Sequence, residues 1–164
     1  MILLKDILVA TDFEEASAVA LNYGRDLARS YGSTLHVVHA AENAMARYSG
    51  EGSLAVLPQL QSDLEEAARK RLADLVTDED RTLLHAKAVL LTALGTAEAI
   101  VDYAKEHHVD LIVMGTHGRR ALAHLLMGSV AERVVRTAPC PVLTVRHPEH
   151  EFIGPDALAA VAGA

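Results

Sequence analysis

The chain has only one cysteine, Cys140, so no disulfide can form within it. A single thiol among 164 residues is typical of a protein that folds in a reducing compartment, and we expect a cytoplasmic location. Charged residues appear as early as Lys5 and Asp6, which is too soon for the apolar core of a signal peptide. The fold must therefore be stabilised mainly by a hydrophobic core, without covalent cross-links.

Long apolar runs, aromatic side chains and positive charge are also scarce. No uncharged apolar run approaches the ~18 residues of a membrane-spanning helix, so we expect a soluble protein with no membrane partner. There are two phenylalanines, four tyrosines and no tryptophan, which leaves little for stacking on nucleic-acid bases. The net charge is −7, and we take Arg119 with Arg120, which is small, as the candidate basic patch. Nucleic-acid binding is therefore disfavoured.

The chain does have short aliphatic runs of the kind that form strands covered on both faces. A further strand, less buried and near the margin of the sheet, fits residues 82–91, where polar and small side chains alternate. Segments with the apolar period of a helix lie between the strands. The four clear strands are 7–10, 35–38, 111–114 and 142–145, and the apolar helical stripes run through 16–27, 57–75, 97–104 and 131–138.

Strands and helices alternate throughout, which predicts the α/β class: a five-stranded, parallel, doubly wound sheet with right-handed crossovers. The length fits one domain, which we place at residues 1–146. Residues 147–164 are predicted to be a C-terminal tail, because the strand and helix pattern stops there. Residues 42–52 are polar and contain glycine, and we expect them to form a surface loop.

Three glycines lie between the fourth predicted strand and the last helix. Gly115 follows the strand directly, Gly118 comes three residues later, and Gly128 precedes Ser129 at the start of the helix. Open α/β sheets bind ligands at this carboxyl edge. Glycine lets a ligand approach the main chain closely, and the first amides of a helix attract anions. The spacing favours a site for an anionic ligand.

Each of these residues also has a purely structural interpretation. Gly115 and Gly118 can serve a turn, and Ser129 with Glu132 matches a capping box. The two roles of Ser129 are compatible, because a hydroxyl can accept from the backbone and donate to a phosphate oxygen. The P-loop pattern and the Gly-x-Gly-x-x-Gly pattern after the first strand are both absent. A nucleotide loop here must be of another kind.

The pattern Gly115-x-x-Gly118, nine residues and then Gly128-Ser129 resembles the nucleotide loop of the ATP-binding branch of the universal stress protein family. Residues 10–17, 35–39 and 138–146 resemble segments of the same family. Ala121 is a departure, because family loops often carry a further glycine there. The resemblance covers about residues 2–146 and implies a Rossmann-like fold of the adenine nucleotide alpha-hydrolase type, with strand order 3-2-1-4-5.

The resemblance further implies that the chain binds an adenine nucleotide, namely ATP, or alternatively ADP or AMP, together with Mg²⁺. It implies that Ala10, Asp12 and Val38 contact the adenosine end. It implies that ribose and phosphates are held by Met114, Gly115, Gly118, Gly128, Ser129 and Val130. We add Arg119 as the arginine expected to reach the terminal phosphates.

Asp12 has two interpretations that the residues leave open. Its carboxylate would repel phosphate, so as a binding residue it belongs with the sugar or the base, where it can accept hydrogen bonds. Asp12-Phe-Glu-Glu15 also matches a helix start in which the aspartate is the N-cap.

Fast catalysis is not expected. Between Gly115 and Ser129 the sequence has no carboxylate to hold Mg²⁺ and no lysine, so no catalytic residue is assigned and hydrolysis would be slow at most. His36 and His39 fall on opposite faces of their strand, so they do not form a metal pair, and no metal-ligating residue is assigned.

We expect a stress or signalling module that acts as a nucleotide-dependent homodimer with an unidentified protein partner. The alternatives are a slow hydrolase of ATP or another adenine nucleotide, and a dimeric interaction protein with a vestigial pocket. The last strand, from Pro141 to Arg146, would be an exposed edge that must be covered. The resemblance implies that the same strand of a second subunit covers it.

Overall fold

A computed structural model of the chain describes residues 1–43, 56–116 and 127–146. Its parallel sheet has the strand order β3-β2-β1-β4-β5, which confirms the predicted fold. The predicted loop at 42–52, apart from its first two residues, and the tail at 147–164 lie outside the described residues. The strands are β1 (Asp6–Ala10), β2 (Thr34–Glu42), β3 (Lys87–Ala93), β4 (Leu111–Gly115) and β5 (Val142–Val145). The helices are α1 (Glu15–Tyr31), α3 (Leu57–Leu75), α4 (Asp78–Leu83), α5 (Thr96–Glu106) and α6 (Ser129–Thr137).

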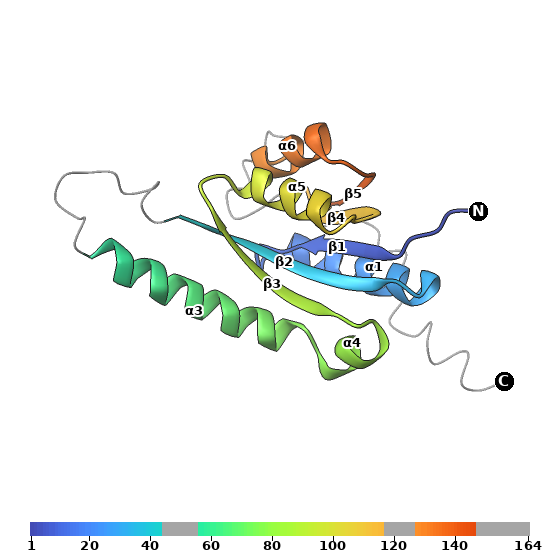
Figure 1. The fold of residues 1–164 in the computed structure, drawn as a ribbon, viewed down its shortest axis with the longest axis horizontal. Helices are drawn as coiled ribbons and strands as arrows, with labels where there is room; N and C mark the ends of the chain where they lie inside the picture. Colours follow the sequence, from blue (N-terminus) through green and yellow to red (C-terminus); the bar gives the residue numbers. More distant parts are fainter. Residues whose placement is uncertain (44–55, 117–126, 147–164) are drawn as a thin grey trace.

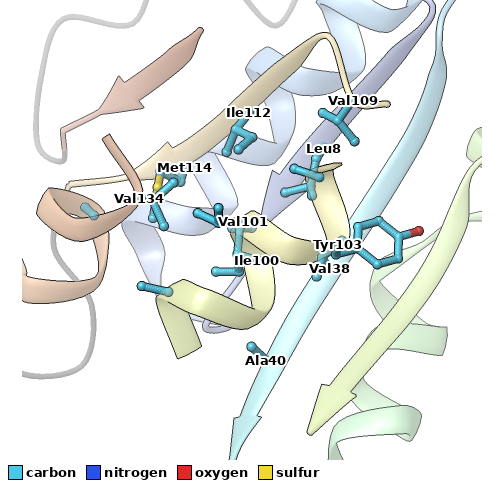
Figure 2. Packing of buried hydrophobic residues seen from close by; sticks show 14 residues of the cluster. Leu8, Val38, Ala40, Ile100, Val101, Tyr103, Val109, Ile112, Met114 and Val134 are labelled. Atoms are coloured by element: carbon cyan, nitrogen blue, oxygen red, sulfur yellow. The ribbon is translucent and has the colours of Figure 1, made fainter. Parts of the chain in front are cut away.

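Helices α1 and α3 cover one face of the sheet, and α5 and α6 cover the other (Figure 1). Successive residues of β1 divide between the two faces, as the pleat requires. Ile7 and Val9 pack in the cluster that includes α1, whereas Leu8 and Ala10 pack in the cluster that includes α5 and α6. Figure 2 shows Leu8 in the second cluster. The central strand of the sheet is thus buried on both sides. Among the described helices, none is long and apolar enough to cross a membrane.

The predicted strand at residues 82–91 is partly wrong, because residues 78–83 form helix α4 and β3 begins only at Lys87. A capping box starts α4: the Thr77 hydroxyl accepts the N–H of Asp80 (3.1 Å), and the Asp80 carboxylate accepts the N–H of Thr77 (3.0 Å). This local signal outweighs the weak alternation after it. The predicted position at the margin of the sheet is correct, since β3 is an edge strand.

Asp80 also forms an ion pair that ties α4 to α1. Its side chain is only 2% exposed and meets the guanidinium of Arg25 at 2.7 Å. A second guanidinium nitrogen of Arg25 donates to Asp80 at 3.0 Å, and Arg25 donates in addition to the carbonyl of Leu75 at the end of α3. Burial acts to raise the pKa of Asp80, but the hydrogen bonds from Arg25 and Thr77 outweigh it and hold that pKa below its usual value.

Candidate functional site

Three of the predicted site residues lie in one row across the sheet. Ala10 of β1 is in register with Val38 of β2 on one side and with Met114 of β4 on the other. All three belong to the cluster packed against α5 and α6, where Figure 2 labels Val38 and Met114. None is more than 7% exposed. These side chains are therefore packed in the core just below the carboxyl edge of the sheet.

The chain leaves β4 at Thr116 and is hydrogen-bonded there to the start of α6. The N–H of Thr116 donates to the carbonyl of Val145 (2.8 Å), and the N–H of Gly128 donates to the carbonyl of Thr116 (2.7 Å). These bonds bring Gly128 to the end of β4, beside the carboxyl end of β1. The predicted site residues Gly118 and Arg119 lie outside the described residues.

The beginning of α6 differs from the predicted capping box. Gly128, not Ser129, is the N-cap, and the structure has no side-chain cap there. The carbonyl of Gly128 accepts the N–H of Glu132 (2.9 Å), so Ser129 is the first helical residue and its side chain is exposed. The capping role of Ser129 is therefore wrong. Its hydroxyl and the first amides of α6 lie at the helix end that attracts anions. Val130, the next residue, is half-buried against the core.

Gly115 has a packing role that the sequence did not reveal. It is the last residue of β4 and pairs with Val145, so it does not form a turn. A Cβ at this position would lie 2.9 Å from the Cβ of Ala16 and 3.0 Å from its carbonyl carbon. The missing side chain thus lets the first turn of α1 pack against the end of β4. This contact is enough to require glycine, whether or not a ligand also approaches.

This contact predicts that Gly115→Ala lowers the free energy of unfolding by about 1–3 kcal/mol, because the added methyl group meets backbone atoms that cannot rotate away. Gly115→Val should cost more. Urea denaturation measures both changes. As a control, Ala73→Val on the exposed surface of α3 should cost no more than about 0.7 kcal/mol, its loss of helix propensity. Wild-type stability of Gly115→Val would show that α1 is not held against β4.

Asp12 is not the N-cap of α1. The helix begins at Glu15 with Glu14 as its N-cap, so the predicted capping box is wrong here too. The carboxylate of Asp12 instead accepts the N–H of Glu14 (3.1 Å), which forms a turn between β1 and α1. Asp12 is partly exposed and lies just beyond the end of β1, on the strand next to β4.

A concavity that the sequence did not predict lies on the face of the sheet that α1 and α3 cover. It is an open pocket of about 310 Å³ between α1 and α3. Phe13 lines the pocket and has a left-handed backbone (φ 67°). Its ring centroid lies 4.4 Å from that of His39 and 4.2 Å from the guanidinium carbon of Arg71. Because residues 13, 39 and 71 meet only through tertiary packing, no local pattern could have indicated this pocket.

His36 and His39 point to opposite faces, as predicted. His36 bonds to Tyr103 of α5, whereas His39 meets Phe13 on the side of α1 and α3 and bonds to the carbonyl of Thr11 (2.7 Å). Over residues 1–43, 56–116 and 127–146, no three His, Cys, Asp or Glu side chains are grouped in a way that could hold a metal ion.

The strand order, the glycine end of β4 and the helix start beside it define an open, doubly wound α/β protein with its candidate site at the carboxyl edge of the sheet. The model of the universal stress protein family matches residues 4–146. The chain belongs to the universal stress protein family.

Individual relatives agree with this assignment. The universal stress protein MJ0531 of Methanocaldococcus jannaschii is 31% identical over 150 residues, which cover 91% of this chain and 86% of that protein. The structure of UspA from Lactobacillus plantarum is 25% identical with a TM-score of 0.72, and the match covers 89% of this chain and 100% of that one. The universal stress protein from Archaeoglobus fulgidus in complex with dAMP is 21% identical with a TM-score of 0.51, over 88% of this chain and 99% of that one. At that identity the likeness concerns the fold alone.

Proposed function

We propose that the chain is an adenine-nucleotide-binding module that acts in stress response or signalling in the cytoplasm. The observation that carries this proposal is the start of α6, where Gly128 is hydrogen-bonded to the end of β4 and Ser129 is exposed. The first amides of a helix have no partner within the helix, so they suit an anionic ligand. The dAMP complex of the Archaeoglobus relative supports the choice of an adenine nucleotide.

In this proposal the phosphates lie against the amides and hydroxyl at the start of α6, and the adenosine lies over the ends of β1 and β2. Asp12 accepts hydrogen bonds from the ribose or base, away from the phosphates, because its charge would repel them. Arg119 reaches the terminal phosphates. Mg²⁺ is bound through phosphate oxygens and water, the ligands it commonly keeps at nucleotide sites.

Isothermal titration calorimetry with ATP, ADP and AMP tests this function. We expect binding heat with at least one of them. The nucleotide with the highest affinity shows how many phosphates the site prefers. Mass spectrometry of the nucleotide that co-purifies with the folded protein gives an independent readout. If no adenine nucleotide produces heat and none co-purifies, the proposal is wrong and the pocket is vestigial.

A slow hydrolase is the second candidate, because nucleotide binding at a helix start is compatible with slow loss of phosphate. Fast phosphoryl transfer uses a carboxylate that holds the metal ion and a lysine that contacts the phosphates. The described residues at the carboxyl edge of the sheet do not include such a carboxylate and lysine side by side. We therefore expect binding without appreciable turnover. Multiple turnovers of phosphate release by the purified protein would favour the hydrolase instead.

We further propose that β5 pairs with the β5 of a second copy. It is an edge strand of the sheet, and its Leu143 is 37% exposed. Leu143→Lys is then expected to shift the protein from dimer to monomer in size-exclusion chromatography with light scattering. Val135→Lys, which also places a lysine at an exposed apolar position, on α6, should leave the dimer intact. A wild-type protein that runs only as a monomer would contradict this proposal.

A further inference from the structure

A buried histidine lies at the edge of the sheet opposite to the candidate site. His36 of β2 is only 1% exposed, and both nitrogens of its ring are within hydrogen-bond distance of a partner. Nε2 lies 3.0 Å from Oδ1 of Asp6, the first residue of β1. Nδ1 lies 2.9 Å from the hydroxyl of Tyr103 on α5 (Figure 2 shows Tyr103 beside β2). One imidazole therefore connects β1, β2 and α5.

The partners of His36 determine which tautomer the neutral ring adopts. A carboxylate can only accept, so Nε2 carries the hydrogen that it donates to Asp6. Nδ1 then has a lone pair, which accepts the hydroxyl hydrogen of Tyr103. A second proton on the ring would occupy Nδ1 and oppose the hydroxyl hydrogen. In its present direction the bond between β2 and α5 therefore requires the neutral imidazole. A charged ring would have to donate from Nδ1 to the Tyr103 oxygen after the hydroxyl had turned, and its charge would remain buried.

Charged groups on the elements packed around the His36 ring act on its pKa. Lys87 of β3 is in register with His36, and the ring of His107 on α5 lies 6.1 Å from it. Burial acts most strongly to lower the pKa of His36, the hydrogen bond with Asp6 raises it, and Lys87 and His107 lower it. The pKa of His36 lies below its ordinary value of 6.5 as a result. Positive neighbours and burial thus outweigh the single carboxylate.

We propose that His36 is an acid-sensitive latch, meaning that its neutral ring holds the C-terminal end of α5 against β1 and β2 and releases it when the cell becomes acidic. The same helix packs through Ile100 and Val101 on the cluster that contains Ala10, Val38 and Met114. Acid would thus loosen the packing of α5 on the residues that lie beneath the proposed nucleotide site. The latch itself does not depend on any nucleotide.

The direction of the pH effect follows from the two states. Below pH 6.5 the unfolded chain protonates its histidine, whereas the folded chain does not until the pH falls through its lower native value. The stabilisation is therefore complete above pH 6.5 and is lost as the pH falls. One proton of difference raises the unfolding equilibrium constant by at most about tenfold per pH unit.

Urea unfolding between pH 8 and pH 5.5 tests this inference. We expect the unfolding constant of the wild type to rise toward acid pH more steeply than that of His36→Gln, whose amide can also donate and accept hydrogen bonds but takes up no proton. His85→Gln, at an exposed histidine, should keep the wild-type slope. Equal slopes for the wild type and His36→Gln would overturn the proposal.

NMR titration and hydrogen exchange provide a test even if His36→Gln does not fold. The pKa of His36 should fall further in Asp6→Asn, which removes the favourable charge and the hydrogen bond that raise it. Amides at the end of α5, including that of His107, should lose protection at pH 5.5 before those of α1. A wild-type His36 that titrates at 6.5 or above, or α5 and α1 exchanging alike, would contradict the latch.

Discussion

Gly128→Val is expected to lower the affinity for adenine nucleotides by about 100-fold or more, while the protein stays folded. The branched side chain would stand where the phosphates approach the first amides of α6, so at least two charge-assisted hydrogen bonds of about 1.5–3 kcal/mol each would be lost. The fold should tolerate valine, because Gly128 has φ −71° and ψ 154°, a conformation open to any residue. Calorimetry measures the affinity, and thermal denaturation checks the fold.

Gly95→Val is the matched control for this experiment. Gly95 is the N-cap of α5 and also has an extended backbone, so both substitutions exchange a glycine N-cap for valine and should cost about 1 kcal/mol of stability at most. The added side chain at 95 meets only the flexible carboxylate of Glu98. Gly95→Val should bind nucleotide as the wild type does. If Gly128→Val kept full affinity, the start of α6 would not be the phosphate site.

Asp80→Ala should lower the free energy of unfolding by about 3–5 kcal/mol, because it leaves the guanidinium of Arg25 partly buried without its counter-charge. The side chain of Arg25 is 19% exposed, so water can only partly replace the carboxylate. The same change removes both bonds of the capping box at Thr77. Equilibrium unfolding in urea measures the loss, which should appear as a lower midpoint with an unchanged slope.

Asp78→Ala provides the comparison two residues away. Its carboxylate also pairs with an arginine, Arg81, at 3.3 Å, but its side chain is fully exposed. An exposed pair of this kind contributes ~0.2–1 kcal/mol at most. Because the pKa of Asp80 is lowered in the fold, its stabilisation is complete at neutral pH and is lost as the pH falls through that lowered value. A loss below 1 kcal/mol in Asp80→Ala would mean that Arg25 readily finds another partner.

The arrangement of strands and helices could be predicted because its signals are local. The aliphatic runs at β1, β2, β4 and β5 and the apolar stripes of the helices each show their period within a few residues. The error at α4 has the same origin. The sequence contained the capping box at Thr77 and Asp80, but the weak alternation after it was given more weight.

The candidate site was predictable only in part. The spacing of Gly115, Gly128 and Ser129 predicted that they meet at the carboxyl edge of the sheet, and the structure brings Gly128 to the end of β4. The local roles of Asp12 and Ser129 were wrong, because each capping box was displaced relative to the true helix start. The start of a helix depends on where the preceding strand and loop end. A sequence pattern alone does not locate the first helical residue to within two residues.

The sequence by itself determined the alternation of strands and helices and, through a family pattern of glycines, indicated the edge at which we propose that a ligand binds. Only the tertiary structure decided that Gly115 makes room for α1, that Arg25 and Asp80 meet inside the fold, and that His36 joins Asp6 to Tyr103. The reason is physical. Periodicity and spacing depend on neighbours along the chain, whereas burial and pairing between distant residues exist only after the layers have packed.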